Sequence, residues 1–405
     1  MSYRALALLA IGLINVQYCF SQSPPPGGGG TVVANPDELL GAQNAITTAV
    51  PFLAISPDAR HAALGDAGVA TSPDANSSYW NAGKLAFIDK KYGGSLSYTP
   101  WLGKIVNDMS ISYLSGFYQI THEQVVAASI KYFDLGDISF RDDKNNQLGD
   151  FHPREFAFDA TYSRLLTEKF SVGITGRYIY SNLTGAFTGI DAKPGNSVAV
   201  DIGTYYTTSF QTAKISTLSL GATITNIGAK LSYTDNQNKD FLPTTLRLGG
   251  AYNIELDPYN RLTFILDFSK LMVPTPPIRD TDGTVIHGRE DNRPLLSGMF
   301  GSFTDAPDGF SEEMHEIMTS VGIEYWYNDL FAARLGYFNE AKTKGNRKYM
   351  TLGLGFRKKQ FGIDVAYLVP VNKRESPLAE TLRFTLLFQV PLQDIDRKES
   401  VTTPE

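Results

Sequence analysis

Acidic residues and arginines recur at equal distances on either side of three short turns in this sequence. The pairs are Asp159 and Arg177 around Glu168, Arg247 and Asp267 around Asp257–Pro258, and Glu324 and Arg334 around Asp329. In an antiparallel hairpin, equal spacing brings two residues side by side on one face of the sheet. We therefore expect three ion pairs that fix strand register and neutralise a polar interior, with a fourth between Asp364 and Arg383. The alternative is a face that is simply polar, on which the pairing is coincidental.

No other residues are spaced as catalytic or metal sites require. The five histidines are scattered, without His-x-x-x-His or Glu-His spacing, and there is no Gly-x-Ser-x-Gly elbow. Serine, histidine and aspartate need only meet in space, so a hidden triad stays open, but nothing indicates one. Neighbouring carboxylates are typical of solvated loops, although calcium at an acidic outer loop is also compatible with them. We expect no catalytic residue, no metal and no cofactor, and hence no enzyme.

The elements that position the charged pairs are short runs of alternating apolar and polar residues, which begin after Gly93. The last run is LRFTLLFQV, residues 382–390. Such alternation places one class of side chain on each face of a strand. A strand with one apolar and one charged face suits a closed barrel with lipid outside and a polar interior. We count fourteen such strands, which predict an all-β, 14-stranded antiparallel transmembrane β-barrel.

The lengths of the connections support the barrel. Turns near Thr121, Glu168, Gln211, Pro258, Asn328 and Lys359 are short, and the links between those hairpins are mostly long. Outer-membrane barrels have tight periplasmic turns and longer outer loops. A soluble sandwich also alternates with period two, but it has no reason to alternate loop length over so many hairpins.

Composition agrees with this class of protein. The chain has 405 residues, a formal net charge of -6 and 12% aromatic residues, which suits a barrel with aromatic girdles. No apolar run after residue 30 reaches the roughly 18 residues of a spanning helix. The mild acidity and the lack of a basic stripe argue against nucleic acid as a partner.

We divide the chain into five parts. Arg4, the apolar run after it, and Cys19 and Ser21 near a cleavage site are typical of a secretory signal peptide. Cleavage after Ser21 would remove the one cysteine. The predicted parts are a signal peptide at 1–21, a flexible linker at 22–50, an N-terminal plug segment at 51–92, the barrel at 93–390 and a periplasmic tail at 391–405.

The link at 271–317 is too long for a bare connector and is expected to be a functional outer loop. Ser311–Met318 within it could form a short amphipathic helix with Ser311 as its N-cap.

The most distinctive stretch is residues 51–87, PFLAISPDARHAALGDAGVATSPDANSSYWNAGKLAF. Asp58 and Arg60 are close enough in sequence to pair, and the glycines permit tight turns or close packing. It reads either as a surface helix before the barrel or as a plug packed on the polar wall of the lumen.

This stretch resembles the N-terminal signature of the PorV family, the outer-membrane barrels of the type IX secretion system. The residues that carry the resemblance are Pro51, Phe52, Asp58, Arg60, Gly65, Asp66, Gly68, Trp80 and Asn81. A second similarity lies in TNIGAKLSY at 225–233 and LPTTLRLGGAY at 242–252. The wider family is similar to the fourteen-stranded FadL transporters. Many members have Asn-Pro-Ala where this chain has Asn81-Ala82-Gly83.

The resemblance implies a secretion component in the outer membrane of a Gram-negative bacterium. Proteins of the PorV family bind the C-terminal signal domain of cargo at the translocon barrel and pass cargo to a cell-surface sortase complex. Outer-membrane lipid would surround the barrel, and the outer loops would meet these partners, through residues that the sequence does not identify. The alternatives are a FadL-like transporter of hydrophobic small molecules and a lipid-modifying enzyme, and the latter lacks a visible Ser–His–acid cluster.

Overall fold

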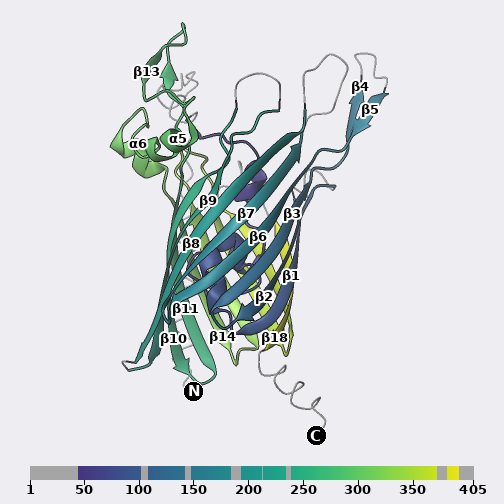
Figure 1. The fold of residues 1–405 in the computed structure, drawn as a ribbon, viewed down its shortest axis with the longest axis vertical. Coiled ribbons are helices and arrows are strands. Elements are labelled where there is room, and N and C mark those ends of the chain that lie inside the picture. The colour runs from purple at the N-terminus through teal and green to yellow at the C-terminus, as the bar shows by residue number, and fades with distance from the viewer. Residues whose placement is uncertain are drawn as a thin grey trace, which may run out of the picture. The chain divides into compact units, whose positions relative to one another are not determined.

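Fourteen strands close into an antiparallel barrel in the computed structural model, which describes residues 44–101, 108–141, 147–183, 193–211, 213–233, 239–371 and 381–391 (Figure 1). The barrel strands are β1 (Lys90–Pro100), β2 (Ser110–Thr121), β3 (Gln124–Asp134), β6 (Arg154–Thr167), β7 (Phe170–Asn182), β8 (Gly195–Gln211), β9 (Ile215–Gly228), β10 (Thr245–Asp257), β11 (Asn260–Leu271), β14 (Met318–Tyr327), β15 (Phe331–Asn339), β16 (Lys348–Lys358), β17 (Phe361–Pro370) and β18 (Leu382–Pro391). Each strand pairs with its neighbour along the chain, and β1 pairs with β18 to close the wall. The predicted fold class is confirmed.

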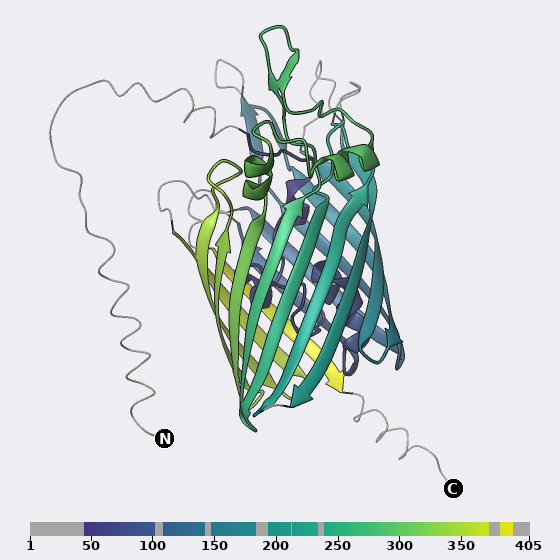
Figure 2. The same cartoon turned by 90° about the vertical axis from the view of Figure 1, so that its left-hand side faces the viewer.

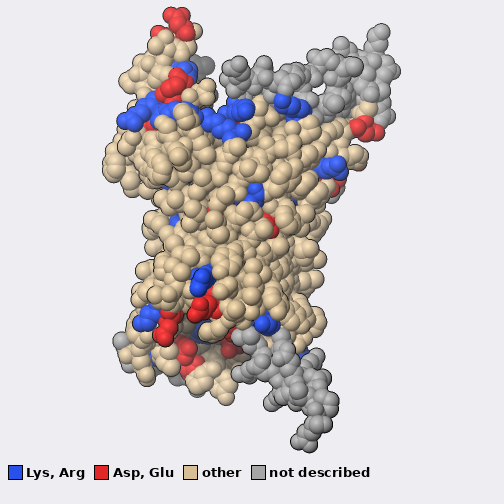
Figure 3. Space-filling model, in the orientation of Figure 1, with Lys and Arg blue, Asp and Glu red and all other residues tan. Residues whose placement is uncertain are grey.

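The two faces of the wall differ as the alternation predicts. On β18, the apolar residues at 382, 384, 386 and 388 are exposed on the outside, whereas Arg383 and Thr385 are buried. Arg177 on β7 is likewise buried. On the face seen in Figure 3, charged side chains gather at the two ends and are sparse between them. An apolar band between two polar ends is the surface that a bilayer requires.

Two long connections at one end of the barrel, those from β3 to β6 and from β11 to β14, carry small elements of their own (Figures 1 and 2). These are the hairpin of β4 (Ile138–Arg141) and β5 (Gln147–Phe151), the hairpin of β12 (Ile278–Arg279) and β13 (Val285–His287), and the helices α5 (Leu295–Gly301) and α6 (Phe310–His315). The helix expected at Ser311–Met318 is α6, which begins one residue earlier, with Gly309 rather than Ser311 as its N-cap. It ends at His315, because Met318 already pairs with Ser269 of β11.

Residues before the first strand form four short helices inside the barrel (Figures 1 and 2). They are η2 (Pro51–Ala54), α3 (Ala59–Ala62), α4 (Ser77–Trp80) and η3 (Ala82–Phe87). Asp58 caps α3 and Asn81 caps η3, each through a side-chain oxygen that accepts from a backbone N–H. None of the helices in the described ranges is long and apolar enough to cross a membrane.

The expected part boundaries differ slightly from the observed elements. β1 begins at Lys90, three residues before the expected start of the barrel, and β18 ends at Pro391. The proposed signal peptide and most of the linker and tail lie outside the described residues.

Candidate functional site

Residues 51–88, here called the luminal segment, contact the barrel wall around its circumference. Its hydrogen bonds to the wall run from Ala59 N to Thr385 Oγ1 (2.9 Å), Gly65 N to Thr351 Oγ1 (2.9 Å), Gly68 N to Asp267 Oδ2 (2.7 Å), Asn81 Nδ2 to Thr204 O (2.9 Å) and Ala86 N to Ser163 Oγ (3.2 Å). These acceptors lie on β18, β16, β11, β8 and β6, on different sides of the closed wall. The segment therefore spans the lumen.

Arg60 ties the luminal segment to the wall through a buried chain of charges. Its guanidinium lies 2.9 Å from Asp74 of the segment and 2.9 Å from Glu324 of β14. Glu324 also accepts from Arg334 Nε at 2.7 Å, and Arg334 Nη1 reaches Asp364 at 2.8 Å. Arg357 completes this Arg60 cluster at 2.5 Å from Asp364. Three guanidiniums and three carboxylates balance, which burial of so many charges requires.

The sequence suggested that Asp58 could pair with Arg60, but the two side chains have different partners. Its carboxylate instead accepts from the Trp80 indole N–H at 2.7 Å and lies 2.8 Å from Nδ1 of His61. The other ring nitrogen of His61 lies 2.9 Å from Thr71 Oγ1. Since Arg60 follows Asp58 on the first turn of α3, the helix points the two side chains in different directions. Asp58 thus organises the segment internally, while Arg60 anchors it.

The signature glycines mark places where backbone or ring packs directly against the segment. Gly65 has a left-handed φ of 68°, and a Cβ there would lie 2.6 Å from the backbone of Tyr337. A Cβ on Gly68 would overlap the Trp80 ring. Asp66, between them, also has a positive φ and accepts from the Tyr349 hydroxyl at 2.5 Å.

The remaining signature residues, Asn81, Phe52 and Pro51, differ in burial and in what they contact. Asn81 donates from Nδ2 to Val69 O at 3.1 Å as well as to the wall. Phe52 is buried in an apolar cluster, whereas Pro51 is exposed at the first position of η2.

The wall contributes a feature that we did not predict, a set of glycines beneath the luminal segment. A Cβ at any of them would clash with the segment or with a neighbouring wall group: Gly173, Gly203, Gly221, Gly249, Gly322, Gly336 and Gly353. Gly173 faces Gly203, Gly221 faces Gly249 and Gly322 faces Gly336 across strand pairs. The sequence does contain a signal for these contacts: the glycines occupy inward positions within strands, where no turn requires glycine and where it often marks the close approach of another part of the chain.

Two of the three predicted ion pairs are present. Asp159 and Arg177 lie opposite each other and are joined at 2.7 Å, and Glu324 and Arg334 likewise at 2.7 Å. Arg177 also lies 3.0 Å from Asp201 of β8, which itself accepts from the backbone of Asn226.

The third pair, Arg247 with Asp267, was predicted wrongly. Arg247 faces Ser269 and Asp267 faces Gly249, because the turn is centred one residue later than expected. Asp267 instead accepts from the backbone N–H groups of Gly68 and Val69, and Arg247 stacks over Tyr79 and Trp80.

Asp364 and Arg383 do not form the fourth pair either. Arg383 faces Ala366 and donates to the carbonyl of Ser56 at 2.7 Å. Arg247 and Arg383 therefore both contact the luminal segment instead of a wall carboxylate. Spacing within a hairpin cannot predict a contact with a segment outside that hairpin.

A cavity of about 530 Å³ lies above the luminal segment, toward the long-loop end. Aromatic side chains line one part of it, including Phe52, Trp101 and Phe133, and Arg347 and Lys344 line another. Asp66, Asp267 and Glu340 also belong to the lining, so the cavity joins apolar surface to charges of both signs.

The connection between β11 and β14, residues 272–317, is here called the outer loop. Buried ion pairs hold it to the barrel: Lys270 contacts Glu313 and Glu316, and Lys344 contacts Glu312 and Glu316. Its apolar side chains nevertheless face outward, with Phe310 80% and Phe300 67% exposed. Leu296 and Met314 are exposed beside them. A loop anchored by charges that presents large apolar side chains is typical of an interaction surface.

No group of three metal-ligating side chains occurs among the described residues.

The outer loop is expected to loosen as pH rises. Burial raises the pKa of Asp305 to about 6; Glu313 and Glu316 add to this rise, and Arg293 opposes it. In the unfolded chain the pKa of an aspartate carboxyl is about 4. A carboxyl whose pKa is raised on folding contributes its full stabilisation at pH values below the unfolded pKa, and this stabilisation is lost as pH rises through the folded pKa of about 6. Limited proteolysis within the outer loop should therefore be slower at pH 5 than at pH 7.5.

The matched variant for this effect is Asp305→Asn. It should make the proteolysis rate nearly independent of pH over this range, once the protease's own pH dependence is calibrated on an unfolded substrate. An unchanged pH dependence in this variant would contradict the assignment of the effect to Asp305.

Several solved barrels are similar to this chain at low identity. The Ralstonia pickettii toluene transporter TbuX is 12% identical, with 82% of this chain and 98% of that chain covered and a TM-score of 0.44. The Pseudomonas putida toluene transporter TodX is 13% identical, with 81% and 95% covered and a TM-score of 0.44. A Pseudomonas aeruginosa FadL homologue is 11% identical, with 86% and 99% covered and a TM-score of 0.42.

No curated protein matches the chain. The family described as type IX secretion system protein PorV matches residues 40–278, which is more than half of the chain. The luminal signature at 51–87 lies inside that match. The chain therefore belongs to the PorV family and is an outer-membrane component of the type IX secretion system of a Gram-negative bacterium.

Proposed function

We propose that this barrel binds the C-terminal signal domain of secreted cargo at the translocon barrel and passes it to the cell-surface sortase complex. The observation that carries the proposal is the apolar surface of the outer loop, formed by Leu296, Phe300, Phe310 and Met314. Large exposed apolar side chains are what a protein partner can bury. We propose binding without catalysis, because the charged side chains of the Arg60 cluster are paired with one another.

The luminal segment supports binding at the rim rather than passage through this barrel. It spans the lumen and is tied to the wall by Arg60, so we propose that residues 51–88 act as a plug. A folded cargo domain would then meet the outer loops while the lumen stays filled.

Replacing Phe300 and Phe310 by aspartate should weaken co-purification of cargo C-terminal domains by about tenfold or more, because each removes an aromatic anchor. The measurement is pull-down of a cargo C-terminal domain by the full-length barrel, together with cargo secretion in cells. Point variants test the apolar surface more specifically than removal of the outer loop does, because removal also takes away Glu313 and Glu316, the ion-pair partners of Lys270. Removal should still leave a folded barrel.

The matched control is Tyr259→Asp, an exposed aromatic residue in the turn at the opposite end of the barrel. It should leave cargo binding unchanged, and heat-modifiable migration should show a folded barrel for all variants. Equal binding by the double variant and the control would contradict the proposal.

The cavity above the luminal segment favours a second candidate, transport of a hydrophobic small molecule. Its aromatic lining by Phe52, Trp101 and Phe133 could hold an apolar ligand. Fatty acid rather than cargo or translocon subunits in the purified material would favour this candidate.

A further inference from the structure

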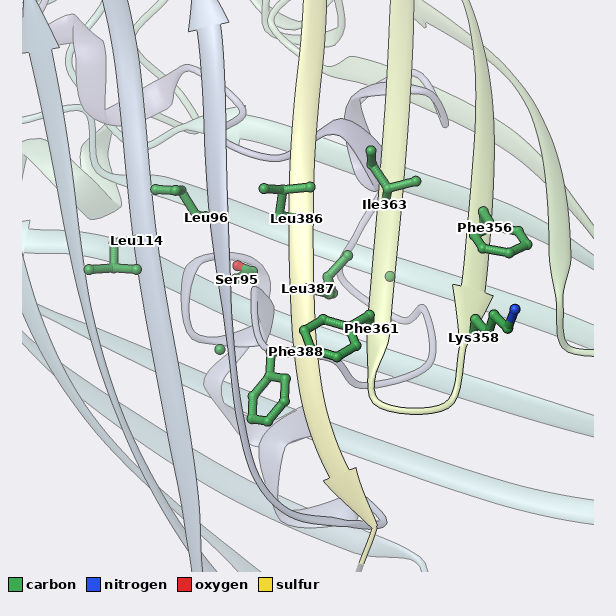
Figure 4. Close-up of a pocket in the computed structure, with 12 residues that line it drawn as sticks. Ser95, Leu96, Leu114, Phe356, Lys358, Phe361, Ile363, Leu386, Leu387 and Phe388 are labelled. Atoms are coloured by element: carbon green, nitrogen blue, oxygen red, sulfur yellow. The ribbon is translucent and has the colours of Figure 1, made fainter.

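The outer wall of the barrel is hollowed where β16, β17, β18, β1 and β2 lie side by side (Figure 4). Two rows of outward side chains cross these strands in register. The upper row is Phe356, Ile363, Leu386, Leu96 and Leu114, and the lower row is Lys358, Phe361, Phe388, Gly94 and Gly116. The hollow between and below them has a volume of about 480 Å³, within the range of about 300–1,000 Å³ typical of small-molecule clefts.

Gly94 lines this hollow and leaves its floor without a side chain. Gly94 faces Gly116 across β1 and β2, so the lower row has no side chain at two neighbouring positions. Leu96 and Leu114 stand above the gap, and Phe388 stands beside it. Phe388 and Phe361 lie with their ring centroids 5.4 Å apart, which extends the apolar wall toward β16.

A positive charge stands at one end of the apolar wall. Lys358 lines the hollow and faces Phe361 at the end of the hairpin of β16 and β17. Its side chain is exposed, and no carboxylate among the described residues forms an ion pair with it. The turn that follows is short, which places Lys358 at the periplasmic end of the barrel.

We propose that the hollow binds one phospholipid of the periplasmic leaflet. An acyl chain lies over Gly94 and Gly116 between Phe388 and the two leucines, and the phosphate lies at Lys358. The chemistry fits at both ends: apolar side chains cover the chain, and an ammonium meets an anion at headgroup depth. A second outward hollow at Val126, Ile174 and Gly176 has no lysine in its lining and would not select such a lipid.

The test is native mass spectrometry of the full-length barrel, released from detergent after titration with phosphatidylglycerol. The wild-type protein should keep one lipid at low lipid ratio. Lys358→Gln should lower the fraction with bound lipid about fivefold, as expected for one lysine at a phosphate. Gly116→Leu should lower it comparably, because a Cβ there meets only the Gly93 carbonyl oxygen, at an ordinary van der Waals distance of 3.6 Å, and the rest of the leucine would fill the floor beside Gly94.

Two controls separate this site from lipid that coats any barrel. Lys169→Gln removes an exposed lysine from another turn at the same end, and Gly176→Leu makes the same glycine change in the second hollow. Both should retain the lipid as the wild type does. Equal loss in variants and controls, or no retained lipid in the wild type, would overturn the proposal. A photo-cross-linker at position 386 that captures a protein instead of lipid in cells would assign the hollow to a partner barrel and overturn it too.

Discussion

Replacing Glu324 by leucine is expected to lower the free energy of unfolding by about 3–5 kcal/mol, the usual cost of removing one partner from a buried ion pair. Glu324 is the carboxylate that both Arg60 of the luminal segment and Arg334 of the wall contact. Its loss leaves the Arg60 cluster with one uncompensated positive charge out of contact with water. The measurement is denaturant unfolding of the full-length barrel in detergent, followed by heat-modifiable migration.

Two further variants separate charge from packing. Glu324→Gln keeps the volume but not the charge and should lose most of the same stability. Glu123→Leu removes a carboxylate that is 60% exposed and 3.9 Å from Arg164, and it should change stability by less than about 1 kcal/mol. A loss below about 1 kcal/mol in Glu324→Leu would mean that the Arg60 cluster is solvated and does not anchor the segment.

Replacing Gly336 by valine is expected to unseat the luminal segment while the barrel still forms. A Cβ at this position of β15 would overlap the backbone of Leu64 and Gly65. Forcing extra atoms into a packed site costs about 1–3 kcal/mol or more, which corresponds to about a 5–150-fold larger displaced population. The measurement is maleimide labelling of a cysteine at buried Ser78, with Cys19 replaced by serine in every variant.

Gly176→Val is the matched control, because Gly176 faces outward on β7 and a Cβ there meets nothing within 4 Å. It should label at the wild-type rate. If Gly336→Val labels no faster than Gly176→Val, the wall adjusts to the added atoms and the glycines do not determine how the segment sits.

Much of the barrel could be predicted from local sequence. Alternation along residues 382–388 predicts which side chains face lipid, and the fourteen strand positions follow from the same pattern. The pairs Asp159–Arg177 and Glu324–Arg334 could be predicted because a tight turn fixes the register of its own hairpin. Arg247 and Asp267 show the limit: an error of one residue in the centre of the turn shifts the partner by two.

Contacts between the luminal segment and the wall could not be predicted in this way. Arg60 meets Glu324 across 264 residues, and no spacing rule relates the two positions. The inward glycines likewise gain their meaning only when Leu64 and Gly65 pack on them.

The sequence by itself determined the barrel, its two-sided wall, the family signature and the register of two hairpins, because these depend on periods of two residues and on short turns. Only the tertiary structure decided that residues 51–88 span the lumen, that Arg60 joins the wall charges, and that glycines form a hollow on the lipid side. Those features depend on which surfaces meet when the wall closes on itself, and closure brings together residues that no local period connects.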